Sequence, residues 1–251
     1  MEYAVETKTY IDNVTANVVS CDCSAELGYT SLAMFEKIGV IGDSYASGLI
    51  FVDNGDGTYT RNNYYSLSWG QVLARRNGVA VTNFSRGGLD TRTWLTDSKG
   101  LTLMQSTEAQ NLYILALGIN DIAIGADYLG TIADITDDYH NNPDTFYGNY
   151  ARIIEQIMEH APNAKIIIST MAGATEDHSN FNAAIKNIAN HYGFPCIEQR
   201  KDDFFLSSFY TDSMVYRHPT AAGYAGMALA LERLIVKCIL DNYVYFTDYV
   251  G

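Results

Sequence analysis

The fold prediction for this chain rests on the stretch Lys37-Ile38-Gly39-Val40-Ile41-Gly42-Asp43-Ser44-Tyr45-Ala46-Ser47. An apolar run from Ile38 to Ile41 ends abruptly in Gly42-Asp43-Ser44. This pattern predicts a buried strand whose carboxyl end carries a serine hydroxyl. Ligands bind at that edge of open α/β sheets. Ser44 is therefore the candidate nucleophile for which the rest of the chain is searched.

Three more apolar runs end in glycine or polar residues. The runs 79–81, 112–117 and 164–168 lead into Asn83-Phe84-Ser85-Arg86-Gly87-Gly88, Gly118-Ile119-Asn120-Asp121 and Ser169-Thr170-Met171. A short strand is also expected at 194–197. Apolar spacing predicts amphipathic helices over 68–77, 146–160, 180–192 and 219–240. Strands alternating with helices in this way indicate a parallel sheet with helices on both faces.

Four segments lie outside this pattern. Residues 1–33 mix β-branched with polar residues, which predicts short strands in an N-terminal extension or connector, with the main domain over 34–251. The tail 243–246 is expected to be a strand that pairs with this extension. Turn residues at 53–57 predict a hairpin, because the full calcium-loop pattern is missing. The acidic segment 125–145 is interpreted as a solvated insertion, with a metal site as the weaker alternative.

Composition excludes several classes of function. With 251 residues, 47% hydrophobic and 18% charged, the chain is typical of a globular protein. A net charge of -13 argues against nucleic-acid binding, because no basic stripe is available to neutralise phosphates. The sequence contains neither a P-loop nor a G-x-G-x-x-G motif, so no nucleotide cofactor is expected.

The four cysteines and the termini give further expectations. Cys21 and Cys23 are too close for the usual zinc knuckle, so they are interpreted as free thiols together with Cys196 and Cys238, and no metal is expected. The first residues lack the features of a signal peptide. The longest apolar stretch, 221–240, is interrupted by charged residues and predicts an amphipathic helix, not a membrane span. The compartment stays open, with an extracellular place in a longer protein as one option.

A serine nucleophile needs a base and donors for the oxyanion. Of five histidines, His218 stands out, because Arg217-His218-Pro219-Thr220 places it where a loop enters a helix. Gly88 can expose its backbone N–H, and Asn120 can aim its carboxamide at the same point. Each also has an ordinary structural interpretation: a surface or capping histidine, a tight turn, and a helix cap. Their combination at strand ends favours an acyl-transfer site.

The blocks Gly42-Asp43-Ser44, Gly88, Gly118-Ile119-Asn120-Asp121 and His218-Pro219 resemble the four blocks of the SGNH (GDSL-type) hydrolase family. The resemblance spans roughly residues 35–240. It implies a flavodoxin-like three-layer α/β/α sandwich and esterase or lipase chemistry on small acyl groups. It also implies that Ser44 is the nucleophile and His218 the base. The oxyanion hole would consist of the Ser44 and Gly88 N–H groups and the Asn120 side chain.

One departure from the family concerns the group behind the histidine. The family usually has an aspartate three residues before it, and this chain has Val215 there. Asp212 is the nearest carboxylate, with Asp202 and Asp203 further upstream. Either one of these contacts the ring, or a backbone carbonyl does and the enzyme uses a Ser-His dyad. The dyad is the favoured interpretation.

The resemblance and the residues together predict a serine esterase acting on short-chain acyl esters, above all acetyl esters, of a carbohydrate. The α/β-hydrolase fold is disfavoured, because no G-x-S-x-G elbow occurs. Candidate substrate contacts, with core packing as the alternative, are Tyr45, Arg86, Arg92 and Trp94. A second hypothesis is a non-catalytic carbohydrate-binding or structural module of a larger surface or phage-tail protein. The oligomeric state is left open.

Overall fold

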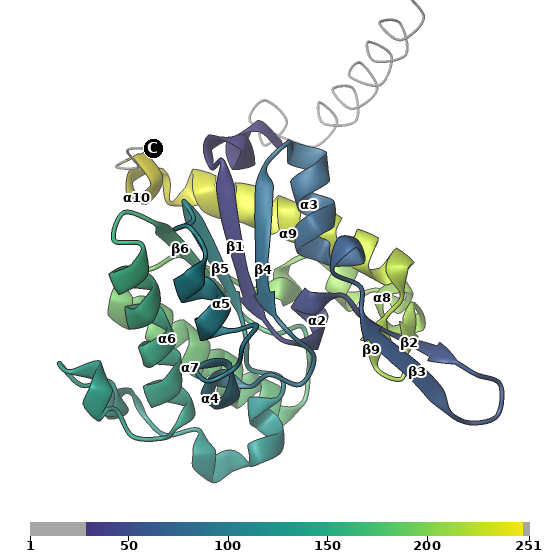
Figure 1. The fold of residues 1–251 in the computed structure, drawn as a ribbon, viewed down its shortest axis with the longest axis horizontal. Helices are drawn as coiled ribbons and strands as arrows, with labels where there is room; N and C mark the ends of the chain where they lie inside the picture. The colour runs from purple at the N-terminus through teal and green to yellow at the C-terminus, as the bar shows by residue number, and fades with distance from the viewer. Residues whose placement is uncertain (1–28, 248–251) are drawn as a thin grey trace, which may run out of the picture.

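The central element of the fold is a five-stranded parallel sheet, seen in a computed structural model that describes residues 29–247 (Figure 1). Its strands, in the spatial order β4-β1-β5-β6-β7, are Ala80–Ser85, Lys37–Gly42, Leu112–Ala116, Lys165–Ser169 and Cys196–Ile197. Numbered along the chain within this sheet, the order is 2-1-3-4-5, the flavodoxin-like arrangement. The predicted parallel sheet is confirmed.

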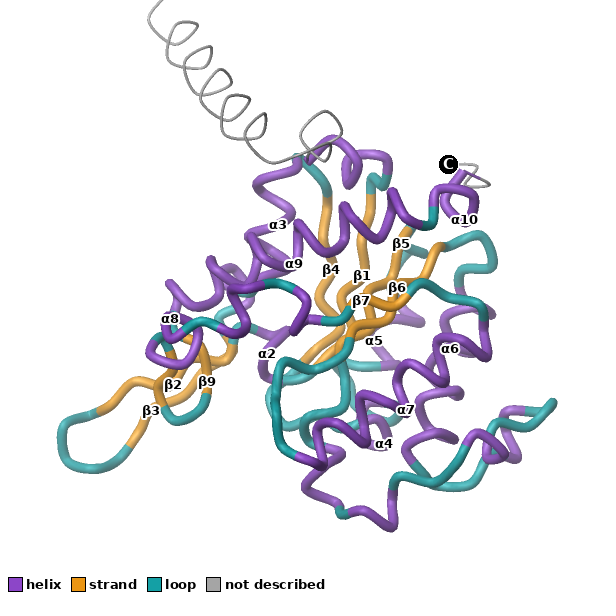
Figure 2. The backbone as a smooth tube through the Cα atoms, turned by 180° about the vertical axis from the view of Figure 1, so that it is seen from behind, coloured by secondary structure: helices purple, strands orange, loops and turns teal. Residues whose placement is uncertain are grey.

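Helices cover both faces of this sheet, which completes the three predicted layers (Figures 1 and 2). One face packs against α3 (Trp69–Asn77) and α9 (Ala221–Asp241). The opposite face packs against α4 (Thr91–Trp94), α5 (Leu101–Ser106), α6 (Phe146–His160) and α7 (Glu176–Tyr192). Successive strand residues alternate between the two cores: Val40 belongs to the first and Ile41 to the second.

The ends of the helices follow from capping residues. Ser68 accepts a hydrogen bond from Gln71 N at the start of α3, and Gly78 ends that helix with φ 67°. The helix expected over 180–192 begins earlier, at Glu176, because Thr175 caps it. The last long helix begins at Ala221 and not at 219, because Thr220 is its cap and Pro219 pairs in a strand.

Two small antiparallel hairpins lie at the carboxyl edge of the main sheet. The first joins β2 (Leu49–Asp53) to β3 (Tyr59–Asn63) and projects from the body of the molecule (Figure 1). In its turn, Asp53 accepts from Gly55 N and Asp56 from Thr58 N, so these aspartates stabilise the turn as predicted. The second hairpin joins β8 (Met214–Val215) to β9 (His218–Pro219) and follows the short helix α8 (Ser208–Asp212).

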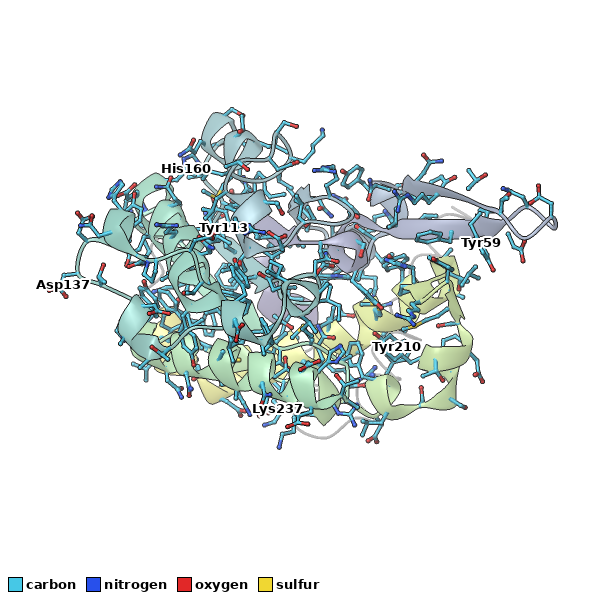
Figure 3. The ribbon with its side chains drawn as sticks, turned by 90° about the horizontal axis from the view of Figure 1, so that it is seen from below. Tyr59, Tyr113, Asp137, His160, Tyr210 and Lys237 are labelled. Atoms are coloured by element: carbon cyan, nitrogen blue, oxygen red, sulfur yellow. The ribbon has the colours of Figure 1, made fainter. Side chains whose placement is uncertain are left out.

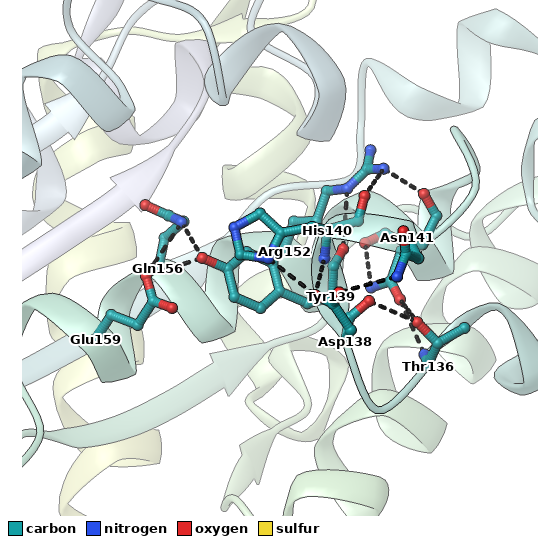
Figure 4. Close-up of polar contacts among 10 residues, drawn as sticks. Thr136, Asp138, Tyr139, His140, Asn141, Arg152, Gln156 and Glu159 are labelled. Atoms are coloured by element: carbon teal, nitrogen blue, oxygen red, sulfur yellow. Dashed lines mark hydrogen bonds and ion pairs between the residues drawn. The ribbon is translucent and has the colours of Figure 1, made fainter.

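The acidic insertion consists of short 3-10 turns fastened to α6. Figure 4 shows Arg152 of α6 donating to the Tyr139 and His140 carbonyl oxygens, and Gln156 donating to the Tyr139 hydroxyl. Asp138 accepts from the ring nitrogen of His140 and from the Asn141 amide. Residues 29–247 contain no group of three or more His, Cys, Asp and Glu side chains arranged to hold a metal.

The prediction of a strand at 243–246 is wrong. These residues form the helix α10 (Tyr243–Thr247). Helical spacing lets the Phe246 ring pack on Phe35 and the Tyr245 hydroxyl accept from Ile166 N, so tertiary contacts override the β propensity of the segment. The expected partner strands, like Cys21 and Cys23, fall outside the described residues, whereas Tyr29–Met34 form a 3-10 helix.

Two other expectations concern cysteines and membranes. Cys196 and Cys238 are unbonded, as predicted. Among the helices of the described part of the chain, none combines the length and the apolar character needed to cross a bilayer.

Candidate active site

Ser44 lies directly after β1, at the sheet edge where the strand order reverses between β1 and β5. It is the first residue of the four-residue helix α2 (Ser44–Ser47), and Asp43 caps this turn by accepting from Tyr45 N. Gly42 cannot carry a side chain, because a Cβ there would lie 2.5 Å from Ala46 Cβ. The Tyr224 hydroxyl of α9 donates a hydrogen bond of 3.0 Å to the Ser44 carbonyl oxygen and so stabilises the turn.

His218 meets Ser44 although 174 residues separate them. Its Nε2 lies 2.9 Å from Ser44 Oγ, the separation of a nucleophile from its base. The ring packs against Phe51 of β2, with centroids 4.8 Å apart, and against Tyr45, with centroids 5.5 Å apart. Neighbouring rings therefore hold the imidazole in place on two sides.

The Nδ1 atom of His218 lies 3.0 Å from the backbone carbonyl oxygen of Tyr216. Because a carbonyl oxygen only accepts, Nδ1 carries the proton and the lone pair of the neutral ring is on Nε2. Within residues 29–247, neither ring nitrogen contacts a carboxylate. Asp202 pairs with Arg233 instead, and Asp212 is an exposed residue at the end of α8.

The carbonyl of Tyr216 reaches the ring because of an unusual turn. Tyr216 and Arg217 link β8 to β9 with φ of 48° and 62°, and no other non-glycine residue in 29–247 has a positive φ. A hairpin loop with two positive φ values is normally built from Gly, Asn or Asp. Backbone strain of this kind concentrates at functional sites.

The electrostatic surroundings of His218 favour its neutral form. Burial lowers the pKa of His218 below its ordinary 6.5, and the positive charge of Arg61 on β3 lowers it further, while the hydrogen bond to Tyr216 opposes both effects. A neutral imidazole is the form that can accept a proton from a serine hydroxyl.

The three oxyanion donors inferred from sequence come from separate elements. Gly88 lies in a tight turn after β4 with φ 89°, and a Cβ there would meet nothing within 4 Å. Asn120 follows β5, and its Nδ2 donates one hydrogen bond to Leu89 O at 2.8 Å, which leaves the second N–H for a ligand. The backbone N–H groups of Ser44 and Gly88 make no hydrogen bond to any residue in 29–247.

Two further contacts fix the Gly88 loop, and sequence reasoning missed both. Asn63, at the end of the β2–β3 hairpin, accepts from Gly87 N and from Ser47 Oγ. Asp121 is fully buried and accepts from both Thr91 N and Thr91 Oγ1 at the start of α4. The position of Asp121 in the Gly-x-Asn-Asp block could have indicated its contact. The Asn63 contact could not be predicted, because it depends on the register of the β2–β3 hairpin alone.

A cavity of about 280 Å³ lies beside the nucleophile turn. Asp43 and Tyr45 line it near Ser44, Ile119 near Asn120, and Met171, Phe205 and Met214 supply apolar walls. Burial raises the pKa of Asp43 to about 7, helped by the charge of Asp121, while its hydrogen bond from Tyr45 N opposes the shift.

The four candidate substrate residues have different positions in the structure. Tyr45 stacks on His218 and donates to Arg217 O, so it belongs to the site. Trp94 does not, because its side chain is completely buried and its indole nitrogen donates to Phe84 O. Arg86 and Arg92 form ion pairs with Asp97 and Asp144.

Comparisons with known proteins give one family match. The model of the GDSL-like lipase/acylhydrolase family matches residues 40–225, which include all four predicted blocks. A comparison with curated proteins gives no match.

Solved structures of similar fold include two enzymes of carbohydrate esterase family 2 and one phospholipase. The enzyme from Cellvibrio japonicus matches with TM-score 0.56 and 18% identity over 81% of this chain and 61% of its own. That from Corynascus thermopiles, solved with a carbohydrate-binding domain, matches with TM-score 0.56 and 17% identity over 81% and 66%. Phospholipase A1 from Streptomyces albidoflavus matches with TM-score 0.51 and 20% identity over 80% and 99%. At such identities the likeness shows the fold alone.

Proposed function

Because the chain belongs to the GDSL-like lipase/acylhydrolase family, whose members are carboxylic ester hydrolases, we propose that it hydrolyses short-chain acyl esters, above all acetyl esters of a carbohydrate. The observation that carries this proposal is the 2.9 Å separation of Ser44 Oγ and His218 Nε2. A serine hydroxyl is a weak nucleophile at neutral pH, and an adjacent neutral imidazole activates it.

In the proposed reaction, Ser44 Oγ attacks the ester carbonyl carbon as His218 Nε2 takes the hydroxyl proton. The carbonyl oxygen becomes an oxyanion that accepts from Ser44 N, Gly88 N and Asn120 Nδ2. Collapse of this tetrahedral intermediate breaks the ester bond, and His218 returns the proton to the departing alkoxide. Water then repeats the sequence on the acyl-enzyme and releases the carboxylic acid, with the same proton transfers.

The positive charge that forms on His218 during each step is stabilised without a carboxylate. The Tyr216 carbonyl oxygen holds the Nδ1–H, which fixes the tautomer and partly balances the imidazolium. The non-catalytic alternative rested on Val215 in place of the aspartate and on the N-terminal extension, most of which lies outside the described residues. An acceptor for Nδ1 is nevertheless present, so the geometry favours the enzyme.

The size of a cavity next to Ser44, whose lining includes Asp43 and Tyr45 but neither Ser44 nor His218, supports a small acyl group. The cavity beside Tyr45 and Ile119 has about 280 Å³, near the lower end of small-molecule sites. A sugar is proposed as the alcohol because two of the proteins that share this fold are carbohydrate esterases.

The test is hydrolysis of p-nitrophenyl acetate by the wild type and by Ser44→Ala and His218→Ala. We expect kcat to fall by roughly 10³ or more in each variant, and by no more in the double variant, because the two side chains act as a unit. Ser208→Ala, a change in exposed α8, is the matched control and should keep wild-type activity. Equal activity in Ser44→Ala and the wild type would overturn the proposal.

A further inference from the structure

The position of His218 defines where the alcohol part of an ester lies, if the proposed function holds. His218 must hand its proton to the leaving oxygen, so that oxygen lies next to Nε2. The alcohol therefore extends over the residues that surround the imidazole. Two hairpins lie next to the ring: β2–β3, which contributes Phe51, and β8–β9, which carries His218 itself and the Tyr216 ring packed on Phe51.

Aromatic side chains continue from His218 onto these hairpins. Phe51 contacts the imidazole and is buried, and the Tyr216 ring lies on Phe51 with centroids 5.1 Å apart. Tyr59 lies on Tyr216, also at 5.1 Å, and Figure 3 shows it on the hairpin that projects from the body. Tyr216 is 64% and Tyr59 41% exposed. We call these two exposed rings the aromatic ledge.

The backbone under the ledge is strained, which points to a use for the ring of Tyr216. Its φ of 48° would suit glycine, asparagine or aspartate, which hairpin turns of this kind normally contain. A bulky residue is held there only at a cost in backbone strain. Large aromatic rings such as tyrosine provide rigid contact area at low entropic cost, and the apolar C–H face of a sugar is a fitting partner.

Arg61 supplies a charge at the same place. It is paired across the hairpin with Phe51, so the two side chains share the face that carries Tyr59. It is exposed, and it forms no ion pair with any residue in 29–247. Asp53, the carboxylate two positions along on the partner strand, accepts instead from Gly55 N in the turn.

An unpaired arginine beside a base is unfavourable in the free enzyme. In a chain of net charge -13, Arg76, Arg86, Arg92 and Arg233 contact carboxylates, whereas within the described residues Arg61 forms no ion pair, as is also true of Arg75, Arg152, Arg200 and Arg217. Arg61 lies near enough to His218 for its charge to oppose formation of the imidazolium. A ligand carboxylate next to Arg61 would cancel this opposition and gain a charge-assisted hydrogen bond.

We propose that this side of the site binds an acidic sugar, whose ring lies on Tyr216 and Tyr59 and whose carboxylate pairs with Arg61. The substrate would then be an acylated carboxylate-bearing glycan. This inference rests on the proposed function and specifies its alcohol.

The test compares sugar esters that differ only in charge. Mono-O-acetylated hexuronic acids and the matching mono-O-acetylated hexoses are assayed for kcat/KM. The wild type should prefer the hexuronic acids by at least about tenfold, the value of one charge-assisted contact. Arg61→Gln should lose that preference and Arg61→Lys should keep part of it. Arg75→Gln, an equal charge change at an exposed position of α3, should leave it at the wild-type value. Equal kcat/KM values of the wild type for both kinds of sugar ester would overturn the proposed pairing of a substrate carboxylate with Arg61.

The ledge is tested with Tyr59→Ala, which leaves the turn beside His218 untouched. Ethyl acetate provides the reference, because its alcohol has no ring. We expect kcat/KM for the sugar esters to fall about tenfold relative to ethyl acetate, and Tyr59→Phe to retain the wild-type ratio, since stacking needs the ring and not the hydroxyl. If the ratio of kcat/KM for the sugar esters to kcat/KM for ethyl acetate is the same in Tyr59→Ala and the wild type, the aromatic ledge does not contact the substrate.

Binding separates a failure of this inference from a failure of the proposed function. If no ester is hydrolysed and Ser44 proves unreactive, the reaction is wrong. Free hexuronic acid should still bind the wild type more tightly than the matching hexose, and Arg61→Gln should abolish the difference. If esters are hydrolysed but neither charge nor ring matters, the inference alone is wrong.

Discussion

The ring nitrogen Nδ1 of His218 donates a hydrogen bond to the backbone carbonyl of Tyr216, two residues before it, at 3.0 Å. In the proposed mechanism, this backbone carbonyl takes the part that a carboxylate usually has in a Ser-His-Asp triad. The strained turn at Tyr216 and Arg217 is what brings this carbonyl to the ring. The arrangement fixes the tautomer of the base without placing a negative charge next to it.

A carboxylate introduced at position 215 tests this interpretation. Val215 is paired with His218 across the β8–β9 hairpin, so an aspartate there would lie on the same face as the imidazole. In Val215→Asp, we expect the acidic limb of kcat/KM to move to higher pH by about one unit, because a nearby negative charge stabilises the imidazolium. The uncharged isostere Val215→Asn is the control, and an identical profile for the two variants would contradict the prediction.

The acidic limb of the wild type should lie below pH 6.5. Burial and then Arg61 lower the pKa of His218 from that ordinary value, and only the neutral ring accepts the serine proton. Activity is therefore retained at mildly acidic pH and is lost once the ring is protonated. The measurement is kcat/KM for p-nitrophenyl acetate between pH 4 and pH 9. Asp43, whose pKa is about 7, could also give a limb in this range, so the profile is repeated with Asp43→Asn. An acidic limb above pH 7 in that variant would show that the pKa of His218 is not lowered.

Asn120→Ala should act mainly on kcat. Loss of one oxyanion donor typically lowers kcat by about 10²–10³ while substrate binding changes little, because the contact strengthens in the transition state. Asn187→Ala is a comparable control, because it also removes one side-chain amide. The Asn187 amide, on α7, donates to the Tyr147 hydroxyl on α6. A rise in KM with kcat preserved would mean that Asn120 contacts the substrate in its ground state instead.

Asp43 makes a prediction about stability. Its pKa is raised from 3.8 to about 7 by burial, so between these values the folded protein keeps a proton that the unfolded chain releases. The stabilising effect of this proton is complete at low pH and is lost as the pH rises through 7. Asp43→Asn cannot ionise, so its stability relative to the wild type should increase by at least about 1.4 kcal/mol between pH 5 and pH 8.

Denaturant unfolding at the two pH values measures this change. Asp97→Asn is the control, because the pKa of Asp97 is shifted in the opposite direction: Arg86 holds it below its ordinary value. Asp97 is therefore ionised above pH 5 in both the folded and the unfolded protein. Its stability relative to the wild type should differ by the same amount at both pH values. Parallel behaviour of the Asp43 and Asp97 variants would contradict the raised pKa.

The sheet and the position of Ser44 could be predicted from strand ends, whereas His218 was singled out by its place at the entry to the last long helix. Each apolar run of the parallel sheet stops at a glycine or polar cluster, and parallel strands bring those clusters to one edge. Length and periodicity were also sufficient for α6, whose predicted bounds are those observed.

What the sequence did not reveal depends on short or irregular elements. The β8–β9 hairpin has only two residues in each strand and no glycine in its turn, so neither periodicity nor turn chemistry signals it. Arg61 and Asn63 reach the site only through the register of the β2–β3 hairpin. The C-terminal tail was misread, because its alternating aromatic pattern suits a strand while its packing on Phe35 requires a helix.

The most direct test of the central claim is covalent labelling of the protein by a fluorophosphonate, followed by mapping of the modified peptide by mass spectrometry. The account predicts one labelled residue, Ser44, with labelling slowed by roughly 10² or more in His218→Ala, because the imidazole activates the hydroxyl. Labelling at another serine, or an equal rate at Ser44 in His218→Ala, would contradict it.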